Sequence, residues 1–102
     1  MSAHMIAMIY ATDFSWIPEY SKNVPQIVKK FGGSYNFVSA GPIEVPEGDL
    51  PIPAAVGTFN FPSREAILNF LNSKEYQPFI ELRNRHSKTQ ILIFDGRAGP
   101  DI

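Results

Sequence analysis

The sequence predicts an α+β domain with the element order β-α-β-β-α-β. Strand-length apolar segments alternate with segments whose apolar residues recur every three or four positions, and glycine or proline stands between them. The second helical segment is broken in two. In a chain of 102 residues, this order is the ferredoxin-like pattern, a four-stranded antiparallel sheet with both helical regions on one face.

The first half of the chain supplies a strand, a helix and a second strand. Residues 6–11 are apolar on both faces, which is typical of a strand that is covered on two sides. Asp13 and Ser15 offer side-chain oxygens that could cap the following helix. Gly32-Gly33 ends that helix, because glycine adopts the left-handed conformation at low cost. Residues 34–40 are then expected to form the second strand.

The second half begins with a long loop and returns to strand and helix. Residues 41–53 contain four prolines and two glycines, so we expect a loop that is either functional or a plain exposed connector. A third strand is expected at 55–61, followed by a helix that Ser63 caps. Pro78 suits the first turn of the next helix, and 90–94 is expected to be the last strand.

A chain of this length is expected to form one domain with a modest core, here spanning residues 6–96. His4-Met5 is a common remnant of a cloning site, so residues 1–5 are interpreted as a cloning remnant or a flexible start. Residues 97–102 are expected to be a flexible tail. His4 is therefore not a candidate functional residue.

The composition excludes several classes of function. A formal net charge of −1 with scattered basic residues gives no electrostatic case for nucleic acid or an anionic membrane as a partner. The absence of cysteine excludes disulfides and thiolate chemistry. Apolar runs are far shorter than the ~20 residues of a spanning helix, and no signal peptide is evident, so a cytoplasmic protein is expected. Apart from His4 the only histidine is His86, and the acids are dispersed, so we expect no metal and no cofactor.

The pattern of the strands predicts a homodimer. Both helical regions cover one face of the sheet, yet the strands at 6–11 and 90–94 are apolar on both faces. Soluble monomers rarely expose a contiguous apolar sheet face. We therefore expect a second copy to cover it, which makes a dimeric α+β barrel with two-fold symmetry.

Short motifs follow one another through the chain: Tyr20, Phe31-Gly32-Gly33, Gly41 with Glu44, Glu47-Gly48, Phe61-Pro62-Ser63, Ser73-x-Glu75-Tyr76-Gln77, Leu82-Arg83 and Asp95-Gly96. In this order and spacing the chain resembles a family called domain of unknown function 1330, within the dimeric α+β barrel superfamily. The resemblance implies the same fold and a homodimer. It implies no single reaction, because the superfamily includes cofactor-free monooxygenases, isomerases and haem enzymes. The Pro-rich residues 50–53 depart from the family pattern, as does the lack of a Trp or basic residue near the third strand.

Three residues are candidates for binding a small molecule between the helices and the sheet. Tyr20 and Tyr76 occupy inward positions of the two helical regions, and their phenols need partners if they are buried. The alternative is that both are core aromatics bonded to the backbone. Arg83 shares a helical stripe with Tyr76, and its planar guanidinium suits a carboxylate or phosphate. Its alternative role is a salt bridge to a loop acid such as Glu44, or capping of free carbonyls.

Two further residues are weaker candidates for the same site. Asn60 is polar in an apolar strand, so in a packed interior it needs a ligand, a water or the other subunit as a partner. His86 lies at the end of a helix that also carries Arg83 and Arg85, where a cation interacts favourably with the helix dipole. That role is favoured for His86 over a catalytic base.

Two hypotheses for function follow. The first is a homodimeric small-molecule-binding protein with a pocket for a small organic acid or aromatic metabolite. If it is an enzyme, we expect cofactor-independent proton transfer or oxygenation, with Arg83 holding an anionic group and Tyr20 and Tyr76 orienting or protonating. The alternative is a non-catalytic structural or interaction protein of the same fold, which predicts a filled interior.

Overall fold

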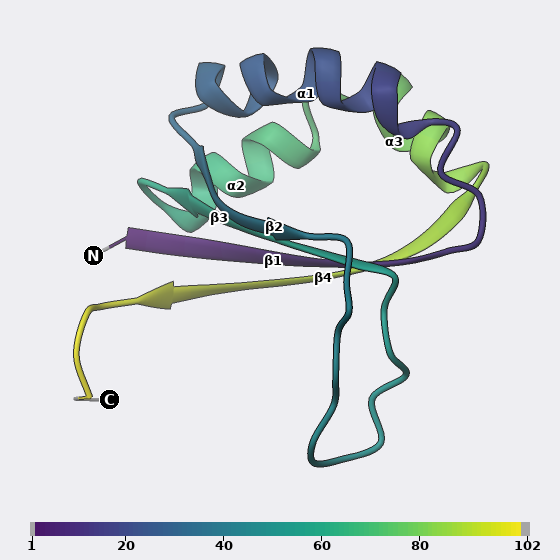
Figure 1. Ribbon diagram of the computed structural model, residues 1–102. Coiled ribbons are helices and arrows are strands. Elements are labelled where there is room, and N and C mark those ends of the chain that lie inside the picture. Colours follow the sequence, from purple (N-terminus) through teal and green to yellow (C-terminus); the bar gives the residue numbers. More distant parts are fainter. Residues whose placement is uncertain (1, 101–102) are drawn as a thin grey trace.

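The computed structural model describes residues 2–100, and Figure 1 shows how the elements are arranged. The strands form one antiparallel sheet in the order β2-β3-β1-β4. The predicted α+β class and element order are therefore confirmed. The elements are β1 (Ser2–Ala11), α1 (Ile17–Lys30), β2 (Ser34–Ser39), β3 (Ala55–Phe61), α2 (Arg64–Leu71), α3 (Gln77–Asn84) and β4 (Ser87–Gly96).

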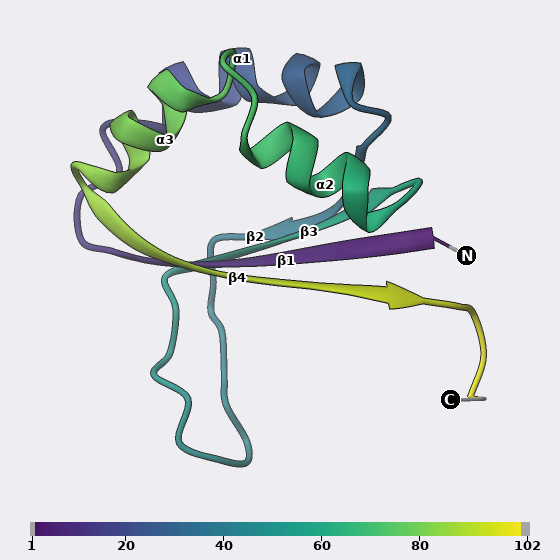
Figure 2. The ribbon, with the colours of Figure 1, turned by 180° about the vertical axis from the view of Figure 1, so that it is seen from behind.

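All three helices lie on the same side of the sheet, as the two opposite views in Figures 1 and 2 show. The register assigns side chains to the two faces, because directly paired residues of neighbouring strands point the same way. Ala7 of β1 pairs with Gly57 of β3 and Ile91 of β4 on the helix-facing side. Ile6 pairs with Thr58 and Leu92 on the opposite side, which we call the outer face. None of the helices within residues 2–100 combines the length and apolarity needed to cross a membrane.

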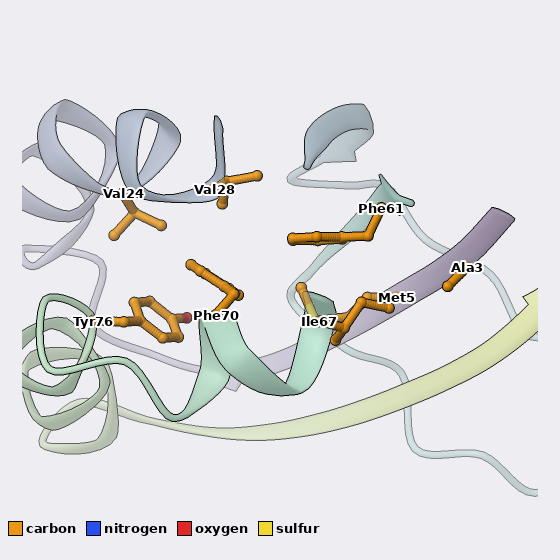
Figure 3. Close-up of a cluster of buried hydrophobic side chains, with 8 residues drawn as sticks. All are labelled: Ala3, Met5, Val24, Val28, Phe61, Ile67, Phe70 and Tyr76. Atoms are coloured by element: carbon orange, nitrogen blue, oxygen red, sulfur yellow. The ribbon is translucent and has the colours of Figure 1, made fainter. Parts of the chain in front are cut away.

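The core lies between α1, α2 and one end of the sheet, as Figure 3 shows. Phe70 of α2 is 1% exposed, and its ring stacks on that of Tyr76 with the ring centres 4.3 Å apart. The buried cluster joins side chains from four elements (β1, α1, β3 and α2) and from the turn before α3. Its members are Ala3, Met5, Val24, Val28, Phe61, Ile67, Phe70 and Tyr76.

Strand β1 starts at Ser2, four residues before the expected Ile6. Ala3 and Met5 point toward the helices and are 0% and 3% exposed. Burying these two side chains holds the start of the strand in the sheet, so residues 2–5 are part of the domain and not a flexible start. Met1 and residues 101–102 of the expected tail lie outside the described residues.

The ends of the helices follow the sequence in part. The Ser63 hydroxyl accepts a hydrogen bond from the Ala66 amide at 3.0 Å, so Ser63 caps α2 as expected. At the start of α1 the N-cap residue is Trp16, and no side chain caps it. Asp13 accepts instead from the Ser15 amide at 2.9 Å, because the chain makes a further turn before the helix begins.

Residues 40–54 connect β2 to β3 and form what we call the arm. In both views the arm extends away from the sheet on the side opposite the helices (Figures 1 and 2). The Tyr10 hydroxyl donates to the Pro51 carbonyl at 2.9 Å, which fastens the returning half of the arm to β1. Leu50 and Ile52 of the arm are 48% and 62% exposed. The predicted loop is thus a projecting segment with apolar side chains in solvent.

Candidate functional site

A cavity of about 340 Å³ lies between α1 and the helix-facing side of the sheet. Its floor is formed by small residues of the central strands, among them Ala7 and Gly57. A side chain at position 57 would fill part of this space, since a Cβ there would lie 3.2 Å from the Phe59 ring. The cavity exists because β1 and β3 carry small residues where α1 passes over them.

Tyr20, Tyr76 and Arg83 come together at this cavity in a chain of hydrogen bonds. Arg83 Nη1 donates to the Tyr76 hydroxyl at 2.9 Å, and the Tyr76 hydroxyl is hydrogen-bonded to that of Tyr20. Tyr76 stands just before α3, whereas Arg83 lies in its last turn. As the helical spacing in the sequence suggested, both side chains lie on the side of α3 that faces α1 and the sheet.

Burial raises the pKa of the Tyr76 phenol at this site. Tyr76 is 2% exposed, and desolvation raises its pKa well above the ordinary phenol value, with Tyr20 adding to the rise and Arg83 opposing it. The pKa of Tyr35, which lines the cavity from β2, is also raised by partial desolvation, although 38% of the residue is exposed. Both phenols are therefore neutral hydrogen-bonding groups at physiological pH and cannot serve as bases.

Arg83 is the charged residue that lines the cavity, and it is 7% exposed. Within residues 2–100 no carboxylate lies within ion-pairing distance of it, and Glu44 of the arm is not its partner. Its Nε is buried without a hydrogen-bond partner, as is Oγ1 of Thr89 on β4. Thr89 lines the same cavity. Buried polar atoms are nearly always paired in native proteins, so these two atoms are exceptions within residues 2–100.

Asn60 and His86 lie elsewhere. Asn60 is on the outer face, where its Oδ1 is 2.8 Å from Nδ1 of His4. His86 Nδ1 is 2.9 Å from Asp13 Oδ2, and the pKa of Asp13 is lowered, first by the Ser15 amide and also by His86. His86 faces an open hollow with Arg85 beside the base of the arm. The structure does not bring these two candidates to the cavity.

Thr89, Tyr35 and Gly57 are among the residues that line the cavity without having been predicted from the sequence. Thr89 stood outside the expected last strand, although it pairs with Ile9 on the helix-facing side. Tyr35 and Gly57 lie in strands that the sequence predicted, but the strand pattern alone does not single them out. The signal for Gly57 was available, because a glycine inside a strand often marks a close approach or an open space. No cluster of three or more His, Asp or Glu side chains suited to a metal ion is found in residues 2–100.

Fold and cavity together define a small ferredoxin-like α+β protein with a largely apolar pocket under its first helix. Over residues 2–97 the chain matches the family model described as "Domain of unknown function (DUF1330)", and it belongs to that family. No match was found among curated proteins.

Several solved structures share the fold. A protein of unknown function from Rhodopseudomonas palustris superposes with a TM-score of 0.73 at 10% identity, covering 96% of this chain and 84% of that one. SnoaB, a cofactor-independent oxygenase from Streptomyces nogalater, gives a TM-score of 0.68 at 9% identity, covering 96% and 95%. An antibiotic biosynthesis monooxygenase gives 0.60 at 11% identity, covering 96% and 100%. At these identities the likeness shows the fold alone.

Proposed function

We propose that this protein is a homodimer that binds a small organic acid or aromatic metabolite in the cavity under α1. The observation that carries the proposal is Arg83, a buried cation that lines a cavity of about 340 Å³ and has no carboxylate partner within residues 2–100. Ligand pockets are typically 300–1,000 Å³ and mostly apolar, with a few polar groups. A purely structural protein would have filled this space, as the alternative hypothesis requires.

The side chains present support cofactor-independent chemistry if the site is catalytic. The Tyr76 oxygen accepts from the Arg83 guanidinium, which leaves the Tyr76–Tyr20 pair free to orient a hydroxyl proton toward the cavity. A hydroxyl polarised in this way is a better donor, because hydrogen bonds in a chain strengthen one another. Tyr20 and Tyr76 would then orient or protonate a substrate oxygen. A cofactor-independent oxygenase among the proteins of this fold is consistent with such chemistry.

The outer face supports the proposed homodimer. Phe37, Leu92 and Phe94 lie on this face and are 72%, 52% and 40% exposed in the single chain. The arm does not cover them, because it extends away from the sheet (Figure 1). Large apolar patches on soluble proteins commonly mark interfaces, and an identical surface on a second copy would cover this one by two-fold symmetry.

Ligand binding is tested with a panel of small organic acids and aromatic compounds, measured by thermal shift and native mass spectrometry. At least one compound should stabilise the wild type and should not stabilise Ala7→Phe, which fills the cavity floor while leaving Arg83 in place. Ala98→Phe, on an exposed residue beyond β4, is the matched control and should behave as wild type. If no compound on the panel binds, or if Ala7→Phe binds as well as wild type, the proposed site is wrong.

The homodimer is tested by sedimentation or light scattering at micromolar concentration. Leu92→Lys places a charge on the outer face and should shift the protein toward monomer. Leu68→Lys is the matched control, because Leu68 is 44% exposed on α2 in the helix layer. A wild-type protein that stays monomeric throughout this range contradicts the homodimer.

A further inference from the structure

We infer that the ligand of the cavity is a monocarboxylate with a flat, uncharged body, and that its carboxylate is bound by Arg83 and Thr89. The inference rests on the proposed small-molecule function and specifies the chemical class and the orientation of the ligand. It starts from the two buried atoms that have no partner in residues 2–100, Arg83 Nε and Thr89 Oγ1. Arg83 lies at the end of α3 and Thr89 near the start of β4, and both line the cavity.

The single positive charge of Arg83 in the cavity lining favours a ligand with a single negative charge. Arginine stays protonated at all ordinary pH values, and the other residues that line the cavity are uncharged. A buried charge without a partner is costly, so an anion that neutralises Arg83 gains affinity. A second negative charge on the same ligand would be buried without a cation to pair with it. Dianions such as a phosphate monoester or a dicarboxylate are therefore disfavoured.

The orientation of the guanidinium favours a carboxylate as the anionic group. Nη1 is occupied by the Tyr76 hydroxyl, which leaves the edge of the guanidinium that carries Nε. On that edge two N–H groups point in parallel, and their spacing matches the two oxygens of a carboxylate. The Thr89 hydroxyl can donate to one of the same oxygens. The two unpartnered atoms are thus satisfied by one planar group.

The rest of the cavity suits a flat apolar body. Away from Arg83 the lining is mainly hydrophobic, with Val24 above, Ala7 and Gly57 below, and the rings of Tyr35 and Phe59 at the β2 side. The volume of about 340 Å³ is roughly twice that of an engineered 150 Å³ cavity that binds benzene. Two fused rings, or one ring with a short side chain, are of the right size.

The inference is tested with three matched probes: naphthoate, the neutral naphthylmethanol, and naphthyl phosphate, each measured by titration calorimetry. Naphthoate should bind the wild type more tightly than either of the other two. Arg83→Met should weaken naphthoate binding on the order of 100-fold, because an ion pair buried in an apolar site is lost. Thr89→Val should weaken it roughly 10-fold or more, the effect of one hydrogen bond to a charged group. Arg85→Met, which changes an exposed arginine two positions along the chain, is the control and should leave binding unchanged.

The outcomes separate this inference from the proposed function. Equal binding of naphthoate and naphthylmethanol, with no effect of Arg83→Met, overturns the carboxylate site but leaves a small-molecule pocket. Tighter binding of naphthyl phosphate overturns the restriction to a single charge. If none of the three binds while another compound on the panel does, the inferred ligand class is wrong. If nothing on the panel binds either, the proposed function itself fails.

Discussion

Replacing Arg83 by methionine should make the unliganded protein more stable. Arg83 is 7% exposed, and within residues 2–100 its guanidinium makes one hydrogen bond, to Tyr76 at 2.9 Å. Such a bond to a charged group contributes about 1.5–3 kcal/mol, whereas burying an ion costs several kcal/mol when no counter-ion offsets it. Methionine fills much of the same volume, and Tyr76 keeps its hydrogen bond to Tyr20. We expect the free energy of unfolding to rise by about 1 kcal/mol.

The assay is chemical and thermal unfolding of Arg83→Met and wild type at one protein concentration, because the stability of a dimer depends on concentration. In a domain of this size a gain of about 1 kcal/mol raises Tm by roughly 4–8 °C. Arg85→Met, at an exposed position, should change stability by less than about 0.5 kcal/mol. A loss of more than about 1 kcal/mol in Arg83→Met would show that Arg83 supports the fold, and the reasoning from an unpaired buried charge would be refuted.

Three other outcomes are expected. Phe70→Ala should lower the free energy of unfolding by about 3–5 kcal/mol in denaturant titration, because the ring is 1% exposed in the core; a loss below about 1 kcal/mol would contradict this packing. Gly33→Ala should cost about 1–3 kcal/mol in the same assay, since its Cβ would lie 2.5 Å from the Phe61 ring; unchanged stability would contradict that close approach. The pKa of the buried Tyr76 is raised, so above pH ~10 its phenol loses the proton in the unfolded chain before it does so in the folded protein. Stability should therefore fall as pH rises from there. An absorbance titration should show a tyrosine that ionises only on unfolding, and ionisation of every tyrosine near the ordinary phenol pKa in the folded protein would contradict this.

Much of the fold could be predicted because local patterns and global packing agree. The third strand was expected at residues 55–61 and is observed at Ala55–Phe61, since Pro53 and Pro62 flank an alternating run there. Ser63 was recognised as a cap from its type and position alone. The start of β1 was mistaken, because the sequence around His4 resembles a cloning remnant. What holds residues 2–5 in place is the packing of Ala3 and Met5, which is a tertiary contact.

The candidate site was predictable only in part. Helical spacing was enough to place Tyr76 and Arg83 on one stripe and to suggest Tyr20 opposite them. It could not show that Arg83 lacks a counter-ion, because that depends on where every acid of the chain lies in space. Thr89 could not be found from its neighbours in sequence, since its importance comes from an unsatisfied hydroxyl in a cavity lined by other elements.

Along β1, the side chains of Ala7 and Ile9 point into the cavity. Those of Ile6 and Met8 lie on the outer face of the same strand. Because consecutive side chains of a strand point in opposite directions, no single residue of this stretch contributes to both surfaces. Substitutions that reshape the cavity can therefore accumulate in related chains without altering the outer face. One sheet can in this way acquire new ligands while keeping the surface that faces away from the helices unchanged.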